Sequence, residues 1–447
     1  MRAHSGKAIR PAILLAVVAA AAIVAALLSS RTGAAPAREG GVSAVSAAAV
    51  TIDLCADEGT LTLPGPATVN IWGFSLDAGS GCGPATLPGP VLDVNEGDVV
   101  TLNLRNYLDE PVSIVFPGQD LMPDATGAPP NDGTGLVVAM AATALSGGGA
   151  TTAASLTTAL AGDNNDVTYT ADTEGAAGNS ITVEYVDPGA ASSLLDVTVA
   201  GTAITVSLAT DARSAISSTA NDVMAAVNAD VDAAPLVNAA LAPGTVSYTF
   251  TASSPGTYLY EAGTNTAVQV GMGLYGALIV RPVIGAYGAG TEYDVERVLV
   301  LSEIDPNLNN SPTGPNDFDF VGDPAVFTGG YHPTYFLING EGYPDTDAIP
   351  AGVGQRVLLR YLNAGLSHHT MTLLGEHQRV IAKDGYPTAA NAYEAVAETV
   401  PAGSTLDAIT TLDTAASGDE LPLYNRQLNV TNNGAYPGGM LTFIEVS

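Results

Sequence analysis

Residues 91–104 read VLDVNEGDVVTLNL, and apolar side chains alternate with polar ones on both sides of the turn Glu96-Gly97-Asp98. Such alternation predicts half-buried β-strands, because successive side chains of a strand point to opposite faces. The same pattern occurs at 69–74 and 112–116, and Gly and Pro separate these short runs at regular intervals. The sequence therefore predicts an all-β fold of the sandwich type.

A change of composition divides the chain into domains. Residues 137–242 are rich in Ala, Gly and Thr, and they contain four strand-like runs and a helical pattern from Thr219 through Val231. We predict that this segment is a small α+β module inserted into a loop of the first domain. The first β-domain is then formed by residues 51–136 and 243–285, and a second β-domain by residues 290–447.

The first 30 residues have the layout of an export signal. A basic start precedes an apolar run from Ala12 to Leu28. Two interpretations stay open: a cleaved signal peptide, and an uncleaved membrane anchor, since the run is close in length to a bilayer span. Residues 31–50 are predicted to be a flexible linker. Both interpretations place the folded part outside the cytoplasm, as a secreted, extracellular or cell-surface protein or in the periplasm.

The rest of the chain is strongly acidic. Five of the fourteen Lys and Arg residues lie within the first 38 residues, which contain no Asp or Glu, so 9 basic and 45 acidic residues remain, a formal charge of −36. Such a surface repels nucleic acid phosphates and anionic lipids, and we exclude both as partners. We expect self-association or contacts with other surface proteins, and membrane contact only through an uncleaved N-terminal segment.

The two cysteines, Cys55 and Cys82, lie 27 residues apart near the start of the first domain. In an oxidising compartment we expect them to form a disulfide. The alternative, in which one of them is a copper thiolate, needs histidines nearby, and the first domain contains none.

Several motifs resemble those of multicopper oxidases. In the first domain they are Gly97–Asn106, Ser113–Gly118, Pro255–Tyr260 and Gly271–Ala277; in the second they are Leu337–Gly340, Val353–Arg360, Ala382–Gly385 and Pro437–Met440. The resemblance covers about 300 residues and matches the first two domains of that family. It implies two cupredoxin-type Greek-key β-sandwich domains.

The copper ligands that this resemblance would imply are replaced. Where the family has His-Trp/Phe-His-Gly, this chain has Val115-Phe116-Pro117-Gly118, and where the family has Tyr-His-Ser-His, it has Tyr260-Glu261-Ala262-Gly263. The degenerate copper positions are therefore Val115, Pro117, Glu261 and Gly263. Copper of this kind is held by imidazole and thiolate ligands. We therefore expect no catalytic residue and no cofactor, and copper in particular is not expected.

Other side chains are weaker candidates for metal ligands. His369, Met371 and His377 would gather around one copper ion if their strands paired favourably; the alternative is that they are packing or surface residues. Asp163 with Asp166, and Asp317 with Asp319, offer the oxygen ligands that Ca²⁺ prefers. The alternative for these carboxylates is a role as solvated turn residues.

Three functions follow as hypotheses. The first is a non-catalytic extracellular protein with a structural, assembly or binding role at the cell surface, as in a surface layer, sheath or filament. The second is a multicopper oxidase-type oxidoreductase with an altered or partner-supplied metal site. The third is a docking subunit for a separate redox protein. We favour the first, because the implied ligands are absent and fold alone does not establish function.

Overall fold

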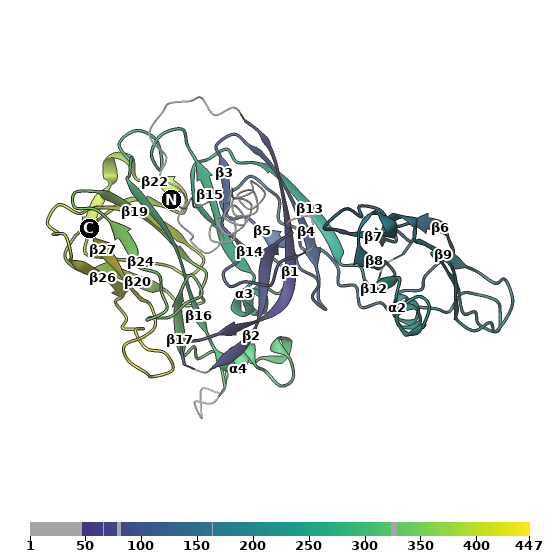
Figure 1. Ribbon diagram of the computed structural model, residues 1–447. Coiled ribbons are helices and arrows are strands. Elements are labelled where there is room, and N and C mark those ends of the chain that lie inside the picture. Colours follow the sequence, from purple (N-terminus) through teal and green to yellow (C-terminus); the bar gives the residue numbers. More distant parts are fainter. Residues whose placement is uncertain (1–46, 66, 78–81, 163, 323–328) are drawn as a thin grey trace, which may run out of the picture.

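The computed structural model describes residues 47–447 except 66, 78–81, 163 and 323–328. The predicted export segment, most of the predicted linker and Asp163 lie outside the described residues. Two β-sandwiches form the body of the molecule, and a smaller module extends from one side of it (Figure 1). The prediction of an all-β protein with two sandwich domains and an inserted α+β module is confirmed.

The first sandwich has two four-stranded sheets. Along β4, Val100, Leu102 and Leu104 are buried while the residues between them are not, as the alternating sequence predicts. One sheet has the order β13 (Gly244–Thr251), β4 (Val99–Asn106), β1 (Ala49–Thr62) and β2 (Thr68–Leu76); the other has the order β3 (Leu92–Asn95), β15 (Tyr275–Arg281), β14 (Gly256–Ala262) and β5 (Ile114–Val115). The short helix α3 (Thr266–Met272) joins β14 to β15.

The inserted module has a hydrophobic core of its own, formed only by residues between Val137 and Leu241. It extends away from the body beyond the ends of β4 and β13 (Figure 1). Its elements are β6 (Met140–Ala144), β7 (Ala153–Thr157), β8 (Val167–Glu174), η1 (Ala176–Ser180), β9 (Thr182–Val186), β10 (Asp196–Ala200), β11 (Ala203–Ser207), α2 (Ala220–Ala229) and β12 (Val237–Leu241). Two sheets, β10-β11-β9-β6 and β12-β8-β7, enclose the core together with α2.

The helix of the module is shorter than predicted. Helix α2 ends at Ala229, and Val231, which we expected on its apolar face, lies beyond the helix and is 81 % exposed. The start is as the sequence predicts: the Thr219 side chain accepts a hydrogen bond from the backbone of Asp222, and the Asp222 carboxylate accepts one from the backbone of Thr219. This reciprocal arrangement satisfies two backbone donors at the helix start.

Thr219→Ala is expected to lower the stability of the module by about 1 kcal/mol, because it removes this cap. Hydrogen exchange of the amides of α2 would measure the effect locally. Thr151→Ala, which changes an exposed turn residue of the same module, is the control and should leave exchange unchanged. Equal exchange in the two variants would show that the cap does not stabilise the helix.

The second sandwich is formed by a seven-stranded and a five-stranded sheet. The first has the order β17 (Tyr335–Ile338), β16 (Val295–Ile304), β19 (Arg356–Asn363), β25 (Thr405–Thr411), β21 (Gln378–Lys383) and β22 (Tyr386–Pro387), with β23 (Tyr393–Ala395) also paired to β21; the second has the order β18 (Ile349–Ala351), β27 (Leu441–Val446), β26 (Glu420–Asn425), β20 (His369–Leu373) and β24 (Ala397–Val400). Short helical turns are α4 (Pro306–Asn309), η2 (Pro315–Asp317) and η3 (Ala389–Asn391).

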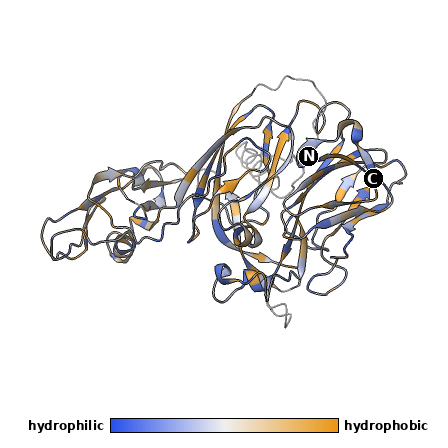
Figure 2. Cartoon of the chain, turned by 180° about the vertical axis from the view of Figure 1, so that it is seen from behind, coloured by the Kyte–Doolittle hydropathy of each residue, from blue (hydrophilic) through white to orange (hydrophobic). Residues whose placement is uncertain are grey.

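The two sandwiches share packing across their contact. The core cluster of the first sandwich includes Val300, Ile304 and Leu337 of the second. Figure 2 shows apolar residues along the strands of both sandwiches. The longest helix in the described part of the chain, α2, has 10 residues and is far too short to span a membrane.

Candidate functional site

The two degenerate copper motifs meet in the first sandwich. Val115 of β5 is the cross-strand partner of Glu261 of β14. Gly263 follows β14 and packs against the same segment: a Cβ atom added there would lie 2.6 Å from Ser113 Oγ and 2.7 Å from Val115 Cγ1. Pro117 lies two residues beyond β5 and is exposed. The structure therefore brings Val115, Glu261 and Gly263 together, and leaves no room for a side chain at position 263 without movement of its neighbours.

Apolar and aromatic side chains pack around the degenerate copper site. Tyr260 is fully buried; its ring lies beside Phe74 and Phe116, and its hydroxyl donates a hydrogen bond to the Pro90 carbonyl. The segment from Ile114 to Pro123 lines a small cavity of about 240 Å³. Burial raises the pKa of the Glu261 carboxyl above its usual range. The site offers one carboxyl group and no imidazole.

His369 is held by a buried hydrogen-bond network in the second sandwich. Its Nε2 atom lies 2.6 Å from Glu303 Oε2, and its Nδ1 atom lies 3.0 Å from Asn425 Nδ2. Because Asn425 Oδ1 accepts the Gln427 backbone N–H at 2.9 Å, the amide nitrogen of Asn425 must face the ring. His369 therefore accepts at Nδ1 and donates from Nε2 to the Glu303 carboxylate, and both ring nitrogens are in use.

The other two copper candidates have different surroundings. Met371 is 1 % exposed and packs in the core of the second sandwich. His377 follows β20, is exposed, and lines a surface cavity. In the described part of the chain, neither His369 nor His377 belongs to a group of three His, Cys, Asp or Glu side chains whose ligand atoms converge. A copper site at these residues would need a rearrangement of the His369 network.

The described acidic candidates satisfy donors of their own turns or are exposed. Asp166 Oδ1 accepts hydrogen bonds from Thr158 Oγ1 and the backbone N–H of Leu160, each at 2.8 Å. Asp319 Oδ1 accepts two backbone N–H groups of the following turn at 3.0 Å, and Asp317 is exposed in η2. Such side chain–backbone bonds are usual for aspartate in turns, and the calcium site stays a prediction.

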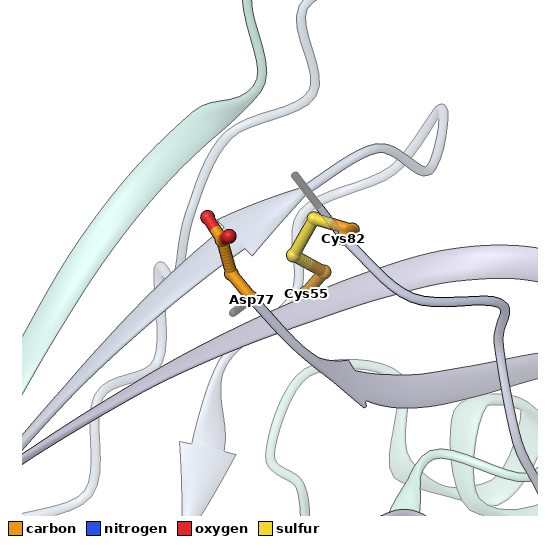
Figure 3. Close-up of side chains that lie close together, drawn as sticks. All are labelled: Cys55, Asp77 and Cys82. Carbon is orange, nitrogen blue, oxygen red and sulfur yellow. A yellow bond between two sulfur atoms is a disulfide. The ribbon is translucent and has the colours of Figure 1, made fainter. Parts of the chain in front are cut away.

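The predicted disulfide between Cys55 and Cys82 is confirmed (Figure 3). Asp77 lies beside it, and these three residues are the one group of convergent ligand atoms of His, Cys, Asp or Glu among the described residues. The Asp77 carboxylate also forms an ion pair with Arg105. Because the two sulfur atoms are bonded to each other, neither cysteine is present as a thiolate ligand.

A buried charge network joins the two sandwiches. Arg360 on β19 is fully buried; its Nε atom lies 2.6 Å from Glu296 Oε1, and its Nη1 atom lies 3.1 Å from Asp407 Oδ2. Nη1 also donates to Thr257 Oγ1 of the first sandwich at 2.8 Å. The Thr257 hydroxyl in turn lies 2.8 Å from Asp407 Oδ1, so the contact spans both domains.

The same network reaches a second arginine. Arg281, at the end of β15, lies 2.8 Å from Glu296 Oε2 and 2.7 Å from Asp93 Oδ1. Burial opposes ionisation of Glu296, but Arg360 and Arg281 outweigh it and hold its pKa below the usual range. Burial raises the pKa of Asp407, and Arg360 reduces the rise. We did not predict this network from the sequence. The feature that could have indicated it is Arg360, an arginine inside the apolar run Val357–Leu362.

Comparisons with known proteins agree with this fold. No protein-family model matches the chain, and no curated protein matches it. Among solved structures, a multicopper oxidase described as mgLAC is similar, with a TM-score of 0.53 and 19 % identity, over 90 % of this chain and 87 % of that one. The blue copper oxidase from Nitrosomonas europaea is also similar, with a TM-score of 0.53 and 18 % identity, over 89 % of this chain and 86 % of that one.

These similarities define the class of fold. The chain has a two-domain, cupredoxin-type β-sandwich fold like that of multicopper oxidases. The likeness concerns the fold, and the chemistry must be argued from the residues of the site.

Proposed function

We propose that this protein is a non-catalytic, extracellular cupredoxin-type protein with a structural, assembly or binding role at the cell surface. The observation that carries the proposal is the composition of the degenerate copper site. Val115 and Glu261 are cross-strand partners there, Gly263 has no space for a side chain, and the small cavity beside them is lined mostly by apolar residues. The imidazole and thiolate ligands that hold copper of this kind are missing from these positions.

Four further features support the proposed role. The export-like N-terminal sequence and the disulfide both fit an oxidising compartment. The formal charge of −36 beyond residue 38 keeps the protein away from nucleic acids and anionic membranes. The inserted module, with its own core, extends from the body and offers a second surface for contacts (Figure 1).

Elemental analysis of the purified full chain after incubation with copper, together with its mass in solution, tests the proposal. We expect far less than one copper per chain and a mass above that of the monomer. A known blue copper oxidase treated in parallel would show that the loading conditions work. Near-stoichiometric copper with oxidase activity would overturn the proposal in favour of an oxidoreductase with an altered metal site. A copper-free monomer would contradict the assembly role and would be consistent with a binding role.

A further inference from the structure

A cavity of about 450 Å³ lies on the second sandwich, away from the degenerate copper site. Its floor is the outer face of the seven-stranded sheet, and Gly290 and Glu292, which precede β16, contribute to its wall. The volume lies in the range of small-molecule sites. None of the functions considered above uses this cavity.

The strand register places two arginines on opposite sides of the cavity floor. Arg356 of β19 is the cross-strand partner of Thr411, and Arg379 of β21 is the partner of Ile409. Thr411 and Ile409 are two residues apart on β25, so their side chains and both arginines share one face of the sheet. Glu394 of β23, on the far side of Arg379, is the next residue of this row. Charged side chains from three strands, β19, β21 and β23, therefore converge on the cavity, and β25 contributes Ile409 and Thr411 between them.

The two arginines differ in their partners. Arg356 forms an ion pair with Glu292 at 3.5 Å. The Arg379 guanidinium has no hydrogen bond or ion pair within the described part of the chain, although Glu394 lies across from it on β23. Of the 9 Lys and Arg residues beyond residue 38, Arg213, Arg379 and Arg426 form no ion pair among the described residues, and of these three Arg379 lines the cavity. A guanidinium without a partner can bind a carboxylate in a bidentate manner.

A fixed carboxylate lies on the same cavity. Glu376 is 9 % exposed, and its Oε1 atom accepts hydrogen bonds from the backbone and hydroxyl of Thr414, both at 2.8 Å, and from the Ala415 backbone at 3.1 Å. These three donors hold the carboxylate in place. Asp413 also lines the cavity. The cavity thus offers anchored negative charge near Asp413 and Glu376 and a free positive charge at Arg379.

We infer that this cavity binds a small zwitterion, with its carboxylate on Arg379 and its ammonium group toward Glu376 and Asp413. A simple anion would meet the repulsion of the surrounding carboxylates, and a simple cation would meet that of the two arginines. A ligand that carries both charges avoids both repulsions, so the charge pattern of the cavity favours a zwitterion over a simple anion or a simple cation. This inference does not depend on the proposed structural role.

The test is a titration of the full chain with γ-aminobutyrate, followed by NMR of the arginine side-chain N–H groups and by calorimetry. Butyrate and butylamine, which each carry one of the two charges, are the matched probes. We expect γ-aminobutyrate to bind with a dissociation constant on the order of 1 mM, and each single-charge probe at least about tenfold more weakly. The Arg379 side-chain N–H signals should shift on binding.

Arg379→Gln should weaken γ-aminobutyrate binding by about tenfold, because it removes a charged hydrogen-bond donor pair. Arg213→Gln, which changes an exposed arginine of the inserted module, is the control and should leave binding unchanged. Butylamine binding as tight as that of γ-aminobutyrate would overturn the inference and indicate only attraction of cations to an acidic surface. The inference would also be overturned if γ-aminobutyrate showed no binding at concentrations well above millimolar, or if the Arg379→Gln and Arg213→Gln variants bound it equally.

Discussion

Arg360→Leu is expected to lower the free energy of unfolding by about 5 kcal/mol. The guanidinium is fully buried and lies within hydrogen-bond distance of Glu296 and Asp407. Its removal leaves two buried carboxylates with less compensation, and breaking a buried ion pair on one side costs about 3–5 kcal/mol. The Thr257 hydroxyl also loses a donor, so the variant should weaken the contact between the two sandwiches.

The pH dependence gives this prediction a second readout. Burial raises the pKa of Asp407, so the folded state holds that proton more tightly than the unfolded chain, and the favourable contribution is lost as pH rises from about 4 through the folded pKa. Without Arg360 the pKa of Asp407 should rise further, and Glu296 should lose part of the effect that lowers its pKa. The stability deficit of Arg360→Leu should therefore be larger near pH 8 than near about pH 5.

Chemical denaturation would measure both effects. Trp72, the one tryptophan, lies in the first sandwich and reports on that domain by fluorescence, while circular dichroism reports on both sandwiches. Arg356→Leu, on the same strand, is the matched control. Its guanidinium is 41 % exposed and forms ion pairs no shorter than 3.5 Å, and it should cost less than about 1 kcal/mol. Similar losses in the two variants, or a deficit independent of pH, would contradict the role of the network.

The alternating pattern was enough to predict the sandwich strands, because period-two burial is a local property of the sequence. The pattern failed in two kinds of segment: where Pro or Gly interrupts a strand, and where a strand consists of small residues. The strand predicted at 112–116 is only Ile114–Val115, since Pro117 cannot donate a ladder hydrogen bond and Gly118 has a φ of +89°. β6 and β7 of the module were missed, because their small residues carry little hydrophobic contrast.

The buried charges could not be predicted from alternation. Asp407 lies between Leu406 and Ala408, and period two therefore indicates a residue on the outer face of its sheet. That face is covered by Thr257 of the first sandwich and by Tyr287, whose hydroxyl donates to Asp407 at 2.5 Å. Which surface covers a strand depends on contacts between distant parts of the chain. Such contacts leave no periodic signal in the sequence.

The surroundings of His369 could not be predicted from the sequence. β20 begins at His369, which is fully buried, while His368 immediately before the strand is exposed and its Nδ1 accepts the Ala402 backbone N–H. The partner that holds His369 in the interior is Glu303, 66 residues earlier in the chain. A separation of this size cannot be inferred from one sequence, so the network was visible only in the structure.

Glu303→Ala is expected to lower the free energy of unfolding by about 4 kcal/mol. The carboxylate is fully buried in the second sandwich and accepts hydrogen bonds from the backbone of Leu366 at 2.9 Å, from the backbone of Ser367 at 2.8 Å and from His369. The variant leaves three donors without this acceptor, of which that of His369 is buried and those of Leu366 and Ser367 are partly buried; a buried unsatisfied donor costs about 1–3 kcal/mol, and the variant also leaves a cavity. Thermal and chemical unfolding of the purified variant would measure the loss.

Glu303→Gln separates the charge and hydrogen-bonding roles from simple packing, because it keeps the shape of the side chain. An amide there can still accept from Leu366 and Ser367, but its NH₂ group would face the Nε2–H of His369, since Asn425 fixes the ring tautomer. We expect a loss of about 2 kcal/mol, between that of Glu303→Ala and none. Glu398→Ala, which removes an ion pair with the partly exposed Lys383, is the control and should cost less than about 1 kcal/mol. If Glu303→Gln were as stable as the unmodified protein, the tautomer assigned to His369 would be wrong; if Glu303→Ala cost no more than Glu398→Ala, the network would not stabilise the second sandwich.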